Sequence, residues 1–72
     1  MNKNYYINLN TGNNPNGNNE VHHSGCVLFN SILNKKYLGE FNNGVEAVNY
    51  AKMLGYSKAD GCRLCSPEAH RG

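Results

Sequence analysis

The chain has 72 residues, a length that allows one small domain over residues 1–72 and excludes a second. Hydrophobic residues make up 39% of it, so the apolar core is small, and we expect a bound metal, a disulfide or a partner to add stability. Seven basic and five acidic residues give a formal net charge of +2. This charge is too small, and the basic residues are too scattered, for a strong nucleic-acid signature.

The apolar segments of the sequence are short. The longest uninterrupted run, residues 26–29, is far below the roughly 20 residues that a membrane-spanning helix needs, so we expect no membrane attachment. The first residues also lack the apolar stretch of about 7 to 15 residues that a secretory signal requires. The sequence therefore predicts a protein of the reducing cytoplasm.

A first β-strand is predicted at residues 5–9, which are rich in aromatic and β-branched residues. A two-residue period puts Tyr5, Ile7 and Leu9 on one face. Residues 10–19 consist of Asn, Gly, Thr and Pro, which favour turns, so we expect a flexible polar loop without a functional site there.

Two more extended segments are predicted, at residues 20–23 and 36–41. A turn of small residues at 24–26 follows the first of them. The apolar residues 27–32 between the two segments are compatible with a short helical turn or with a strand.

The strongest helix prediction covers residues 44–54. Asn43 is a suitable N-cap, and Glu46 three residues later completes a capping box in which Asn replaces Ser or Thr. Gly55 supplies a left-handed C-terminal cap. A core-facing stripe with the spacing i, i+3, i+4, i+7 is formed by Ala47, Val48, Ala51 and Leu54.

The cysteines are the most informative residues of the sequence. Cys62 and Cys65 have the Cys-x-x-Cys spacing, which lets two thiolates bind one tetrahedral ion with Zn–S distances near 2.3 Å. Three cysteines are an odd number, which argues against a scaffold of disulfides. A redox pair would need the N-terminus of a helix, and Pro67 with the short tail after it leaves no room for one.

A second pair of candidate ligands stands far upstream, at His22 and Cys26. The four-residue step between them gives room for a turn that brings both side chains to one point. Two pairs of ligands fit a closed structural zinc site. The sequence therefore predicts Zn²⁺ bound by His22, Cys26, Cys62 and Cys65.

The identity of the imidazole ligand stays open among three histidines. In an extended segment His22 and His23 face opposite ways, so only one of them points at the metal. His70 would reach the ion if the C-terminal tail curled back. We predict His22, with His23 and His70 as the alternatives.

These elements predict an α+β fold. It would be a small zinc-stabilised domain with a short antiparallel β-sheet, one main helix at about residues 44–54 and a C-terminal zinc knuckle.

One motif set extends over roughly residues 20–67. It consists of His22-x3-Cys26, the alanines of the predicted helix, Gly55-Tyr56 and Cys62-Arg63-Leu64-Cys65-Ser66-Pro67. In this set the chain resembles the small Ada-type metal-binding domains. For the DNA-repair member of that family, the resemblance implies a four-cysteine zinc site whose first cysteine accepts a methyl group from a DNA phosphotriester.

The chain departs from that family at the methyl-accepting position, which is His22 here. A neutral imidazole bound to an ion has no free lone pair left to accept an alkyl group. Methyl transfer is therefore not expected. Three thiolates and one imidazole also close the zinc shell, whereas catalytic zinc keeps an open position, so we expect no enzyme activity.

Two functions follow from these residues. The first is a structural-zinc module that binds a partner protein, whose identity the sequence does not indicate. The alternative is a nucleic-acid-binding accessory module related to Ada-type DNA-repair domains. Its phosphate contacts would come from Lys35, Lys36, Arg63 and Arg71, and its stacking surfaces from Tyr5, Tyr6 or Tyr37.

Overall fold

A computed structural model describes residues 2–11 and 17–70 of the chain. Its elements are β1 (Lys3–Asn8), β2 (Asn19–His23), the 3-10 helix η1 (Phe29–Ser31), β3 (Lys35–Phe41), α1 (Gly44–Met53), β4 (Ala59–Gly61) and the 3-10 helix η2 (Pro67–Ala69). The α+β class is confirmed, because α1 packs against a four-stranded sheet.

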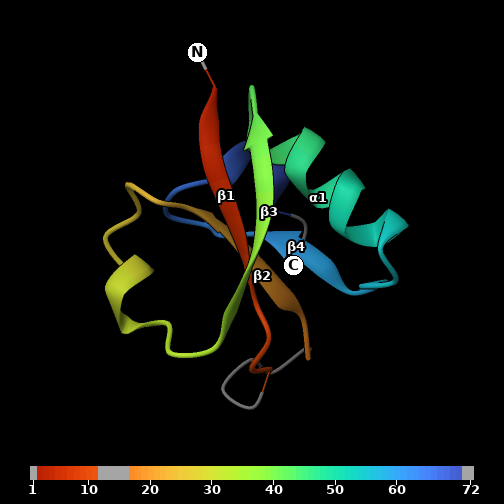
Figure 1. The fold of residues 1–72 in the computed structure, drawn as a ribbon, viewed down its shortest axis with the longest axis horizontal. Helices are drawn as coiled ribbons and strands as arrows, with labels where there is room; N and C mark the ends of the chain where they lie inside the picture. Colours follow the sequence, from red (N-terminus) through yellow and green to blue (C-terminus); the bar gives the residue numbers. More distant parts are fainter. Residues whose placement is uncertain (1, 12–16, 71–72) are drawn as a thin grey trace.

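The strand order in the sheet is β3-β1-β2-β4 (Figure 1). β1 pairs antiparallel with both β2 and β3, whereas β4 pairs parallel with β2. The prediction of an antiparallel sheet is therefore wrong for the last pair, and the sheet is mixed. β4 was not predicted, because its residues Ala, Asp and Gly are poor strand formers and only its non-local pairing defines it.

The first predicted strand is shifted toward the N-terminus. β1 begins at Lys3, which pairs with Phe41 of β3, and it ends at Asn8. Tyr5 and Ile7 are buried as expected. Leu9 was predicted on the same face, but it lies beyond the strand and is 37% exposed.

The segments between β1 and α1 follow the predictions closely. β2 and β3 each begin one residue before the predicted extended segments, and the apolar stretch between them contains the short 3-10 helix η1. Of the predicted polar loop 10–19, residues 12–16 lie outside the described part of the chain.

α1 begins and ends as its capping residues predict. The side-chain oxygen of Asn43 accepts a hydrogen bond from the backbone N–H of Glu46 at 3.0 Å. Gly55 has a φ of +109°, in the region that favours glycine at helix ends. The core-facing stripe is confirmed except at Leu54, which is 46% exposed because the helix stops at Met53 and the chain turns away.

α1 lies beside the sheet (Figure 1), and buried apolar residues from both form the core. Its buried members are Tyr5, Ile7, Val21, Leu38, Ala47, Val48, Ala51, Ala59 and Ala69. Four of them are alanines, whose small side chains bury little apolar area each. The core is therefore small, as the composition predicted. In the described residues, no helix has the length and apolar character needed to cross a lipid bilayer.

The C-terminal segment packs tightly against β4 and the start of α1. A carboxylate oxygen of Glu68 accepts a hydrogen bond from the N–H of Gly44 at 2.7 Å. A methyl group added at Gly61 would lie 2.6 Å from Cβ of Ala69 and 2.7 Å from the carbonyl oxygen of Ser66. Gly61 is therefore required for this close approach, which fixes the position of the segment with Cys62 and Cys65.

Replacing Gly61 by Ala should destabilise the protein by about 1–3 kcal/mol, because the new methyl group overpacks against backbone that cannot move freely. Urea unfolding would measure the change. Gly25→Ala is the matched control, since a methyl there would meet only the side chain of His23, at 3.1 Å. Equal losses in the two variants would contradict the role assigned to Gly61.

Candidate metal centre

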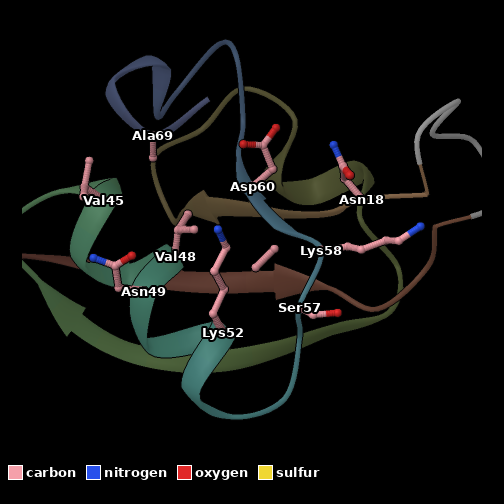
Figure 2. A pocket seen from close by; sticks show the side chains of 10 residues that line it. Asn18, Val45, Val48, Asn49, Lys52, Ser57, Lys58, Asp60 and Ala69 are labelled. Atoms are coloured by element: carbon pink, nitrogen blue, oxygen red, sulfur yellow. The ribbon is translucent and has the colours of Figure 1, made fainter. Parts of the chain in front are cut away.

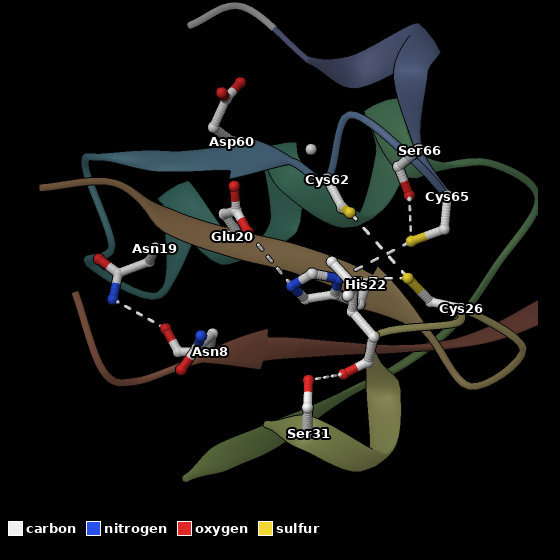
Figure 3. A network of polar contacts seen from close by, with 12 residues as sticks. Asn8, Asn19, Glu20, His22, Cys26, Ser31, Asp60, Cys62, Cys65 and Ser66 are labelled. Atoms are coloured by element: carbon white, nitrogen blue, oxygen red, sulfur yellow. Dashed lines mark hydrogen bonds and ion pairs between the residues drawn. The ribbon is translucent and has the colours of Figure 1, made fainter. Parts of the chain in front are cut away.

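Four side chains that can ligate a metal converge on one point. His22 belongs to β2, and Cys26 lies in the turn that follows it. Cys62 comes directly after β4, and Cys65 lies in the turn before η2. The ligand atoms of these four residues all lie within 4.8 Å of one another (Figure 3).

Local backbone hydrogen bonds bring the two pairs together. The N–H of Cys62 donates to the carbonyl of Val21 at 2.9 Å, which continues the parallel β2–β4 ladder and places Cys62 beside His22. The N–H of Cys26 donates to the carbonyl of His23 at 3.0 Å, and the N–H of Ser66 donates to that of Cys62 at 2.8 Å. These last two bonds close the turns that return Cys26 and Cys65 toward the site.

The separations between the ligand atoms suit a tetrahedral ion. Nδ1 of His22 lies 3.6 Å from Sγ of Cys26 and 3.8 Å from Sγ of Cys65. The Sγ atoms of Cys26 and Cys62 are 4.0 Å apart. With zinc at its usual bond lengths, tetrahedral angles require sulfur–nitrogen distances of about 3.6 Å and sulfur–sulfur distances of about 3.8 Å.

The three thiols are not bridged. All three cysteines are free, and a disulfide would need a sulfur–sulfur distance near 2.05 Å, about half of the separation between Cys26 and Cys62. The donor set is therefore three sulfurs and one imidazole nitrogen, a combination found in structural zinc sites.

Burial sets the protonation of the cluster. It lowers the pKa of His22 to about 4, with a smaller contribution from the charge of His23. It also raises the pKa of the Cys62 thiol, and together with a hydrogen bond to Cys26 it raises the pKa of Cys65 to about 12. At neutral pH His22 is thus ready to ligate as a neutral imidazole, whereas Cys62 and Cys65 carry protons that an ion must displace.

The other two histidines lie elsewhere. Nδ1 of His23 accepts a hydrogen bond from the N–H of Gly25 at 3.0 Å, and its ring packs edge-on against Tyr5. Nδ1 of His70 lies 3.1 Å from the carbonyl of Gly61 and 3.3 Å from a carboxylate oxygen of Asp60. Of the three candidates, the structure brings only His22 to the cysteines.

Two residues near the cluster were not singled out from the sequence. The hydroxyl of buried Ser66 lies 3.8 Å from Sγ of Cys65. A carboxylate oxygen of Glu20 lies 3.6 Å from Nε2 of His22. The strand period of two, which puts residues i and i+2 on one face, is the signal that could have found Glu20.

A pocket of about 420 Å³ lies apart from this cluster, between α1 and β4 (Figure 2). Val48, Lys52 and Asp60 are among its lining residues, and none of the four metal-ligand candidates is. The candidate metal site is therefore separate from the pocket.

Comparisons with known proteins identify no relative: no protein-family model, no curated protein and no solved structure matches this chain.

Zinc binding should release at least two protons per ion at pH 7, because Cys62 and Cys65 are protonated in the metal-free cluster. Protons compete with the ion, so the apparent affinity should fall by at least about 100-fold for each unit that the pH is lowered between about pH 8 and about pH 6. Titration calorimetry in buffers of different ionisation enthalpy measures both quantities. An affinity independent of pH in this range would show that the thiols are not displaced.

Proposed function

We propose that this chain is a structural zinc-binding domain that acts as an interaction module and has no catalytic activity of its own. The observation that carries the proposal is the convergence of one imidazole and three thiols to within 4.8 Å. Three cysteines and one histidine make a complete tetrahedral set, whereas catalytic zinc retains a position for water or substrate.

The chemistry of the donors supports zinc over harder cations. Thiolate sulfur and imidazole nitrogen select zinc, copper(I) or iron among biological metals, whereas magnesium and calcium take oxygen ligands. The tetrahedral separations favour Zn²⁺, which adopts this geometry in closed sites of Cys3His type.

The position of the cluster supports a structural role. Val21 packs into the core on the helix side of the sheet, and its neighbour His22 faces the opposite side. An ion there would join β2 to the C-terminal segment where the apolar core does not reach. Apparent zinc-binding free energies of about 10–16 kcal/mol in zinc-finger peptides match or exceed the whole stability of a typical small domain.

Removing the metal should therefore unfold the chain. The purified protein should contain about one zinc per chain, and its thiols should resist alkylation until a chelator is added. Chelation should collapse the dispersed amide signals in a ¹H–¹⁵N spectrum. An unchanged spectrum from a sample shown to be free of metal would contradict the structural role.

Variants of the ligand residues distinguish unfolding caused by loss of the metal from destabilisation by any substitution near the site. Cys62→Ser and His22→Ala should each lose zinc and the dispersed spectrum. His23→Ala is the matched control, because it removes a neighbouring imidazole that faces away from the cluster and should keep a full equivalent of zinc.

A partner protein would find apolar side chains beside the ligands. Val27 follows Cys26 directly, and Leu64 precedes Cys65, and both are exposed. Metal binding would then hold these two exposed apolar side chains at fixed positions next to the site, which supports an interaction role for the module.

The second candidate function is nucleic-acid binding, in keeping with the resemblance to Ada-type domains. The observation in its favour is a row of aromatic rings on the sheet face opposite the helix. The ring centroids of Tyr6 and Tyr37 are 5.0 Å apart, and the ring of Tyr6 also contacts that of Phe29. Nζ of Lys35 lies 4.5 Å from the centroid of the Phe29 ring.

The other residues predicted to contact nucleic acid differ in exposure. Tyr5 is excluded as a stacking surface because it is only 1% exposed. Lys36 and Arg63 are exposed, and Arg71 lies outside the described residues.

A single-stranded oligonucleotide titrated at low salt tests this candidate. Binding through the aromatic row should weaken with added salt, and Tyr37→Ala should cost about 1–3 kcal/mol of binding free energy through lost stacking. Tyr50→Ala on α1 is the control. A flat titration at low salt would remove nucleic acid as a ligand.

A further inference from the structure

One buried polar atom of the cluster remains without a hydrogen-bond partner. The His22 residue is 1% exposed, and its Nδ1 faces Cys26 and Cys65. Among the described residues Nε2 is the buried side-chain nitrogen or oxygen that has no hydrogen bond. A carboxylate oxygen of Glu20 lies 3.6 Å from it, on the side of the ring away from the sulfurs (Figure 3).

We propose that Glu20 is the positioning residue of the metal centre: its carboxylate accepts the Nε2–H of His22 and so keeps Nδ1 free to bind the ion. The inference rests on the proposed zinc function. Beyond that function, it assigns metal binding to Nδ1 of His22 and names Glu20, which is not a ligand, as the residue that selects this nitrogen.

The chemistry of imidazole makes the two ends of the ring depend on each other. A neutral ring carries one N–H and one lone pair, and the hydrogen bond at one nitrogen decides which nitrogen can ligate. A lone pair on Nε2 would be repelled by the carboxylate oxygen of Glu20. An N–H at the same position would be attracted to that oxygen. Histidines that bind metals commonly donate their second N–H to a carboxylate in this way.

The backbone fixes this pairing. Glu20 and His22 are residues i and i+2 of β2, so their side chains leave the same face of the sheet. The Glu20 side chain is 36% exposed, whereas that of His22 is 2% exposed. Glu20 therefore covers the buried ring from the solvent side, and its carboxylate keeps access to water.

Zinc affinity, measured by competition with a chromophoric chelator, tests the role of Glu20. Glu20→Ala should weaken binding by about 10- to 100-fold, the usual loss when the partner of a ligating histidine is removed. Glu20→Gln keeps an acceptor oxygen without the charge and should recover part of the affinity. Glu40→Ala, which removes an exposed carboxylate from β3, is the control for general attraction of the cation. Equal losses in Glu20→Ala and Glu40→Ala would overturn the inference.

The nitrogen that binds the metal can be observed directly. In full-length protein labelled with ¹⁵N-histidine and loaded with ¹¹³Cd²⁺, Nδ1 of His22 should couple to the metal and Nε2 should retain a proton. In Glu20→Ala that proton should exchange faster with water. Coupling to Nε2 would overturn the inference and leave the proposed function standing. No coupling to His22 at all would overturn both.

Discussion

The parallel pairing of β2 with β4 is the contact on which the candidate site depends. It joins segments about half the chain apart and sets Val21 against Gly61, with Cys62 bonded to the carbonyl of Val21. His22, a candidate ligand, is the next residue along β2, so this register places it beside Cys62. Parallel strands need a crossover connection, which β3 and α1 supply here. The same crossover supplies the helix that buries the core.

The two faces of the sheet are stabilised by different means. On the helix side, the core is built largely from small residues, and close packing at Gly61 allows the C-terminal segment to lie against β4. On the other side lie the candidate metal ligands, of which His22 and Cys62 are almost wholly removed from water. Burying polar groups with few partners is costly, and an ion that satisfies four of them at once reverses that cost. This division supports the proposal that a bound ion stabilises the fold.

The same burial limits the chemistry of the site. Without an ion, desolvation keeps Cys62 and Cys65 protonated, and a thiol is a poorer nucleophile than a thiolate. Four ligands around one ion would leave no position for substrate. Two further features are in keeping with the proposal that the chain binds another macromolecule. Val27 and Leu64 are exposed next to candidate ligands, and the aromatic row lies on the same sheet face as His22.

Features that depend on neighbouring residues could be predicted from the sequence. The period of two in β1, the Asn43 cap of α1 and the Cys62–Cys65 spacing all act within a few residues, so local patterns predicted them. Other features depend on contacts between distant residues and form only in the folded chain. β4 forms from residues with poor strand propensity, and His22 is the histidine that meets the cysteines because its strand pairs with the segment before Cys62. Strand registers between remote segments are fixed by packing of the whole chain, which no local pattern encodes.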